Sequence, residues 1–138
     1  MPLVHVYTRR KFFEPVSGRH SLKVFAERLT EIAARALTVP GTKGALTSAD
    51  VEVRVEEFGE FDVFNSDVAI VVLANMYEER LANLEERRIQ FEQEVVSLLR
   101  EQQKMLLSSF PGVRISSPRR ISIWFPLALG GAYGEVDL

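Results

Sequence analysis

The sequence predicts an α+β domain in which two strand–helix–strand units form one four-stranded sheet with both helices on one face. Two observations favour this fold. Segments typical of strands alternate with two long stretches of helical periodicity, and the order strand, helix, strand occurs twice. Within each unit we expect parallel strands joined by a right-handed crossover. The 138 residues suit a single domain spanning positions 1–138.

The first unit begins with a strand over Leu3–Thr8, which is dense in β-branched and aromatic residues. A helix is expected over His20–Leu37, where apolar side chains recur at helical spacing, and the Val39-Pro40-Gly41 sequence ends it. The next strand, Asp50–Phe58, alternates strictly. Its valines should face the helix layer, whereas a second, charged face carries Glu52, Arg54 and Glu56.

The second unit begins after a connection over 59–66. The unbroken apolar run in Asp67–Asn75 predicts a central strand buried on both faces. A long helix is expected from Glu78 to about Leu107, followed by a last strand within Arg119–Pro126. The glycine-rich tail after Pro126 supports no prediction.

Composition excludes several classes of function. The net charge of −2 gives no basic field for nucleic acid, and the absence of cysteine excludes disulfides, thiolate chemistry and cysteine metal sites. With only His5 and His20, a histidine-rich metal site is not expected. No apolar run reaches the length of a membrane span, and the amino terminus lacks a signal pattern. We therefore expect a cytoplasmic protein without a membrane partner.

Aromatic residues gather where a single chain has little to cover them. These residues are Phe58, Phe61, Phe64, Trp124 and Phe125. A wide exposed apolar patch marks an interaction site, and assembly into a closed ring would cover this one together with the charged sheet face.

Pro2 has two interpretations. Proline is tolerated as the first residue of a strand because the ladder needs no N–H there, and this structural role is the more common one. If Met1 is removed, Pro2 instead becomes a free secondary amine at the end of a strand. Burial would lower the pKa of that amine, which could then act as a general base near neutral pH.

Three motifs together resemble the tautomerase superfamily, over roughly residues 2–126. They are Met1-Pro2 before an apolar strand, the segment 46–55, and a second helix that opens with Arg80 and continues Leu84-Glu85-Glu86-Arg87. The resemblance implies a homotrimer with a barrel-like interior built from three sheets, and three sites near the Pro2 ends that include residues of neighbouring chains. It also implies a tautomerase or isomerase that needs no cofactor and acts on a small unsaturated keto or enol carboxylic acid.

The resemblance also implies roles for individual residues. Pro2 matches the general base. Arg54 matches a substrate-binding arginine within a shift of two residues, which keeps the face of the strand, whereas the strict position is Glu52. Arg80 and Arg87 both approximate an arginine near the start of the second helix, and Arg80 is preferred because it lies nearer the strand end. Further candidates are a third cation from Arg9 or Arg10 and an apolar wall from Trp124 or Phe125. The adjacent cations Arg9, Arg10 and Lys11 are otherwise typical of a solvated loop.

Two alternatives remain open. One is a non-catalytic trimer of the same fold that retains Met1, because fold alone does not imply function. The other is a ferredoxin-like binding module outside this superfamily. An intact-mass measurement would separate the enzyme from both, since only the enzyme requires loss of Met1.

Overall fold

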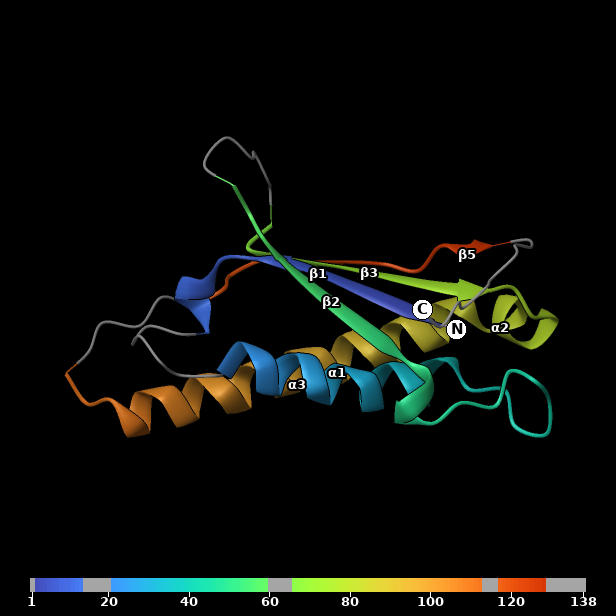
Figure 1. Ribbon diagram of the computed structural model, residues 1–138, viewed down its shortest axis with the longest axis horizontal. Helices are drawn as coiled ribbons and strands as arrows, with labels where there is room; N and C mark the ends of the chain where they lie inside the picture. The colour runs from blue at the N-terminus through green and yellow to red at the C-terminus, as the bar shows by residue number, and fades with distance from the viewer. Residues whose placement is uncertain (1, 14–20, 60–65, 113–116, 129–138) are drawn as a thin grey trace, which may run out of the picture.

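The structure is a computed structural model that describes residues 2–13, 21–59, 66–112 and 117–128. It has two layers, with one mixed sheet against two long helices, α1 (Ser21–Leu37) and α3 (Leu84–Ser109), on the same face (Figure 1). The predicted α+β arrangement is confirmed. The expectations for His20, Phe61 and Phe64 lie outside the described residues.

The sheet has the strand order β2 (Glu52–Glu57), β1 (Leu3–Thr8), β3 (Val68–Asn75) and β4 (Ile121–Trp124). Strand β1 runs parallel to β2, and β3 runs parallel to β4, as the two crossovers predict. The two units meet where β1 and β3 pair antiparallel. A two-residue strand that the sequence did not predict, β5 (Leu127–Ala128), pairs with the end of β3.

The core lies between the sheet and the helices. On β1, Val4, Val6 and Thr8 face the helices and are fully buried, because side chains alternate along a strand. The stripe of α1 buries Phe25 and Leu29, and α3 contributes its own buried apolar residues. Burying each side chain of this size contributes roughly 1.5–3 kcal/mol, so this interface fixes both helices on one face.

The predicted second helix is divided into α2 (Glu78–Ala82) and α3. Asn83 separates them with φ −126° and ψ 34°, outside the helical range. Its side-chain oxygen accepts a hydrogen bond from Arg87 Nε at 2.6 Å and makes no capping bond to a backbone N–H of α3. The break directs α2 towards the end of β3 (Figure 1).

The prediction that the central strand is buried on both faces was wrong for the single chain. Val68, Ile70 and Val72 are fully buried against the helices, but Leu73 is 39% exposed on the other side and Val71 is half-buried. The physical reason is that no described helix covers that side of the sheet (Figure 1).

We call this uncovered side the open face. Its centre is mainly apolar and includes Leu3, His5, Tyr7, Ala69, Val71, Leu73, Ser122 and Trp124, whereas its β2 edge carries Glu52, Arg54 and Glu56. Trp124 is 64% exposed, as the predicted aromatic patch requires. The prediction that Phe125 belongs to this patch was wrong. Its ring packs edge-on against Phe91, with 5.1 Å between the ring centres, at the helix–sheet core. Phe58 is half-buried.

Candidate active site

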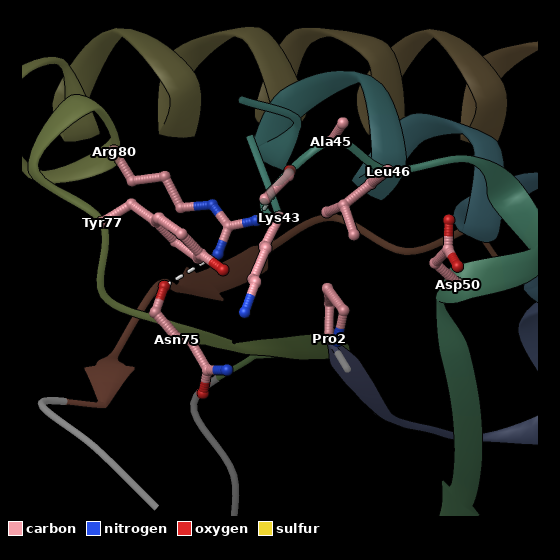
Figure 2. A pocket seen from close by; sticks show the side chains of 9 residues that line it. Pro2, Lys43, Ala45, Leu46, Asp50, Asn75, Tyr77 and Arg80 are labelled. Carbon is pink, nitrogen blue, oxygen red and sulfur yellow. Dashed lines mark hydrogen bonds between the residues drawn. The ribbon is translucent and has the colours of Figure 1, made fainter. Parts of the chain in front are cut away.

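A small cavity of about 230 Å³ opens at the end of the sheet where β1 begins and β3 ends. We call it the Pro2 pocket. It is lined by Pro2, Lys43, Gly44, Ala45, Leu46, Asp50, Asn75, Tyr77 and Arg80 (Figure 2). These residues come from the start of β1, the loop after α1, the η2 turn (Ser48–Asp50), the end of β3 and α2.

Pro2 lines this pocket (Figure 2). It is buried, and its carbonyl oxygen accepts a hydrogen bond from Glu52 N–H at 3.1 Å, which continues the β1–β2 ladder by one residue. The carbonyl end is therefore fixed by the sheet. Two sequence-predicted residues, Pro2 and Arg80, line the same pocket.

Arg80 is almost completely buried, with 2% of its surface exposed. Its Nε donates to Leu37 O at 2.7 Å, and its two terminal nitrogens donate to Asn75 O at 2.8 Å and, at the longer distance of 3.4 Å, to Gly44 O. Its guanidinium also lies 4.7 Å from the ring centre of Tyr77. Burial lowers the pKa of Arg80, yet a guanidinium stays charged.

This charge has no carboxylate partner among the described residues. Leu37 O belongs to the last turn of α1, where backbone carbonyls lack helical partners and the helix dipole favours a cation. Arg80 therefore joins α1, β3 and α2 around the pocket, and its uncompensated charge favours an anion there.

The loop over 38–46 forms one wall and holds residues that sequence reasoning missed. Val39 N–H donates to Gly44 O at 2.8 Å, and Thr42 Oγ1 accepts from Gly44 N–H at 2.9 Å, so the loop closes on itself. Gly44 allows a close approach, since a Cβ there would lie 3.3 Å from the Tyr77 ring. Lys43 is exposed at the pocket and forms no ion pair with a described residue.

Asp50 places a carboxylate in the wall next to Pro2. It closes the η2 turn, because its Oδ2 accepts from Thr47 N–H at 2.7 Å and from Thr47 Oγ1 at 3.0 Å. These two bonds to the ionised form lower the pKa of Asp50. The pocket therefore carries a negative charge on one side of Pro2 and cations on the other (Figure 2).

Arg87 lies outside the pocket. Its Nη1 donates to Ala36 O at 2.8 Å and to Thr38 O at 3.0 Å, and its Nε is bound to Asn83. Together with Arg80 it caps the carboxyl end of α1. The helix break at Asn83 separates the two arginines. Helical periodicity in the sequence does not reveal this break.

Arg54 lies on the open face of β2, opposite His5, and pairs with Glu52 at 2.7 Å. That bond raises the pKa of Arg54. Trp124 is on the same face, opposite Val71 in the register. Arg9 follows the other end of β1 and lies 6.0 Å from the Phe58 ring. The structure does not bring these residues to the Pro2 pocket of their own chain.

Within the described residues, no group of three or more histidine, cysteine, aspartate or glutamate side chains could hold a metal ion. No described helix is both long enough and apolar enough to cross a membrane.

No protein-family model matches the sequence, and no curated protein matches it. Solved structures do. The chain covers 88% of a 5-carboxymethyl-2-hydroxymuconate delta-isomerase, with all of its own length aligned, 8% identity and a TM-score of 0.51. The sequence pattern also resembles this isomerase.

Two further structures are similar over nearly their whole length. Malonate semialdehyde decarboxylase is 14% identical, with 96% of this chain and 91% of that chain covered and a TM-score of 0.48. A domain of unknown function, DUF1904, from Sebaldella termitidis is also 14% identical, with 98% and 95% covered and a TM-score of 0.45. At these identities the likeness concerns the fold. The chain thus shares the fold of a tautomerase-superfamily isomerase, and the resemblance predicted from the sequence is confirmed at that level.

Proposed function

We propose that the protein is a cofactor-independent tautomerase or isomerase that transfers a proton on a small unsaturated keto or enol carboxylic acid. Pro2 acts as general base after removal of Met1. The observation that carries the proposal is the position of Pro2, buried in a pocket that also contains Arg80 and Lys43. The isomerase of similar fold is consistent with this reaction class.

The chemistry follows from the charges around the proline nitrogen. Burial and the cations Lys43 and Arg80 disfavour an ammonium group, whereas the Asp50 carboxylate favours it. In this proposal the first two effects prevail, so a free Pro2 amine is mostly uncharged near neutral pH. It can then take a proton from a carbon next to a carbonyl and return it at a conjugated carbon. The enolate that forms between these steps is stabilised by cations already in place.

We also propose that three chains assemble through their open faces. An apolar face that leaves Leu73 and Trp124 exposed supports assembly, because a monomer exposes few such contiguous patches. In this homotrimer, Arg54, Arg9 and Trp124 of one chain would complete the pocket of a neighbour. This arrangement retains their predicted roles in substrate binding, although they lie outside the pocket of their own chain.

One observation favours the alternative, a non-catalytic trimer that retains Met1. Arg80 and Arg87 both bind backbone carbonyls at the end of α1, which is sufficient to explain why they are there. With Met1 in place the Pro2 nitrogen is a tertiary amide and has no basicity.

Intact mass and activity together test the proposal. We expect the purified protein to lack the mass of Met1 and to tautomerise phenylenolpyruvate or a 2-hydroxymuconate without added metal or cofactor. Pro2→Ala should retain part of this activity, because a primary amine at nearly the same point can also accept a proton. A protein that lacks Met1 and tautomerises neither acid would contradict the proposal.

A further inference from the structure

We infer that Lys43 is the residue that selects the substrate of the Pro2 pocket, and that the pocket prefers a small acid with one carboxylate over one with two. This inference rests on the proposed function for the identity of the substrate, but the binding site that it assigns is defined independently of turnover.

Three arginines that the sequence predicts for substrate binding already have hydrogen-bond partners within the chain. Three of the five N–H groups of Arg80 bind the carbonyls of Leu37, Asn75 and Gly44. Arg87 is bound to α1 and Asn83, and Arg54 lies outside the pocket with Glu52 as its partner. Within one chain, none of the three can turn towards a ligand in this pocket without breaking these bonds. In the proposed trimer, Arg54 of a neighbour would have to exchange its exposed bond with Glu52 for the ligand.

Lys43 is placed differently. It lines the pocket from the loop that Gly44 and Thr42 close, and it has no carboxylate partner among the described residues. Figure 2 shows its side chain reaching into the space between Pro2 and Asn75. A flexible ammonium group there can bind a carboxylate through a charge-assisted hydrogen bond, while the buried Arg80 charge supports the same sign of ligand.

Asp50 limits how many carboxylates fit. It lies on the other side of Pro2 from Lys43 (Figure 2), and its bonds from Thr47 keep it ionised. A ligand with carboxylates at both ends would bring one of them towards Asp50, where like charges repel. The volume of about 230 Å³ is also below the roughly 300–1,000 Å³ of most ligand pockets, which favours a short acid.

The test measures binding of unreactive four-carbon ligands to ¹⁵N-labelled protein by NMR titration. The probes are butanoate, its neutral analogue butanamide, and the dianion succinate. We expect butanoate to bind more tightly than both butanamide and succinate. Lys43→Gln should weaken butanoate binding about tenfold, the effect of losing one charge-assisted contact, whereas Lys43→Arg should largely restore it.

Two control variants sharpen the result. Lys104→Gln removes the same charge from an exposed site on α3 outside the pocket, and should leave the affinity for butanoate unchanged. Asp50→Asn should improve binding of succinate more than that of butanoate. Succinate binding as tightly as butanoate or more tightly, equal affinities for butanoate and butanamide, or equal effects of Lys43→Gln and Lys104→Gln would each overturn the inference.

Because these ligands do not react, the result is separate from catalysis. Lys43-dependent binding in a protein without tautomerase activity would support the selectivity and contradict the proposed function. Turnover that is insensitive to Lys43→Gln, with unchanged KM, would support the proposed function and contradict the selectivity.

Discussion

At the scale of single residues, the pocket combines groups whose surroundings fix their charge. Arg80 is buried with backbone carbonyls as its acceptors, and Asp50 is held ionised by Thr47. Pro2 lies between the two sides of the pocket, with its carbonyl bound into the sheet (Figure 2). In the proposed mechanism, the chemistry depends on whether the nitrogen of Pro2 is an amine or an amide.

The lowered pKa of Asp50 makes a prediction about stability and pH. Because the pKa is lower in the folded state than in the unfolded state, the stabilisation is present above the unfolded value of about 3.9 and is lost as pH falls through the folded value. Asp50→Asn should lower Tm at pH 6, and the difference from wild type should shrink on acidification towards pH 3. A difference that stays constant over this range would contradict the account, and Glu86→Gln, on an exposed position of α3, serves as the control.

At the scale of elements, two arginines from the second unit hold the carboxyl end of α1. Removing Arg80 would leave carbonyls of Leu37, Asn75 and Gly44 without this donor in a buried place. Arg80→Met should therefore lower the free energy of unfolding by about 3 kcal/mol, as measured by urea titration. Arg100→Met, at an exposed position on α3, should change it by less than about 0.5 kcal/mol. Comparable losses from both would mean that Arg80 does not anchor α1.

The elements also show what the sequence could and could not predict. The first strand was predictable from its β-branched and aromatic residues, and the parallel pairs were predictable from the helix that connects the two strands of each unit. Lys43 and Tyr77 were not, because their meeting depends on how the loop over 38–46 closes and on the close approach that Gly44 allows. The different places of Arg80 and Arg87 follow from the break at Asn83, which the apolar periodicity of the sequence does not reveal.

At the scale of the whole molecule, the open face is the surface through which we propose that three chains assemble. The prediction that β3 is buried on both faces fails for one chain at Val71 and Leu73, and the proposed trimer would supply the missing cover. The pattern of the sequence does not show which of its side chains would pack there from a second copy. In the proposed trimer, burial on this side would come from assembly.

We predict a trimer at micromolar concentration by light scattering, and its disruption by Leu73→Lys. The control is Leu107→Lys on α3, which should leave the trimer intact although Leu107 is 54% exposed and Leu73 only 39%. Exposure alone would rank the two substitutions the other way. A monomeric wild-type protein, or dissociation caused equally by both substitutions, would count against assembly through the open face.

The most direct test of the central claim compares the processed protein with one that carries extra residues before Pro2. The extension converts the Pro2 amine into an amide and leaves every other pocket residue in place. We predict that the processed protein tautomerises phenylenolpyruvate with a rate that rises with pH as the amine loses its proton. The extended protein should keep the fold and the oligomeric state but lose this activity. An extended protein that works at the processed rate would remove Pro2 from the mechanism.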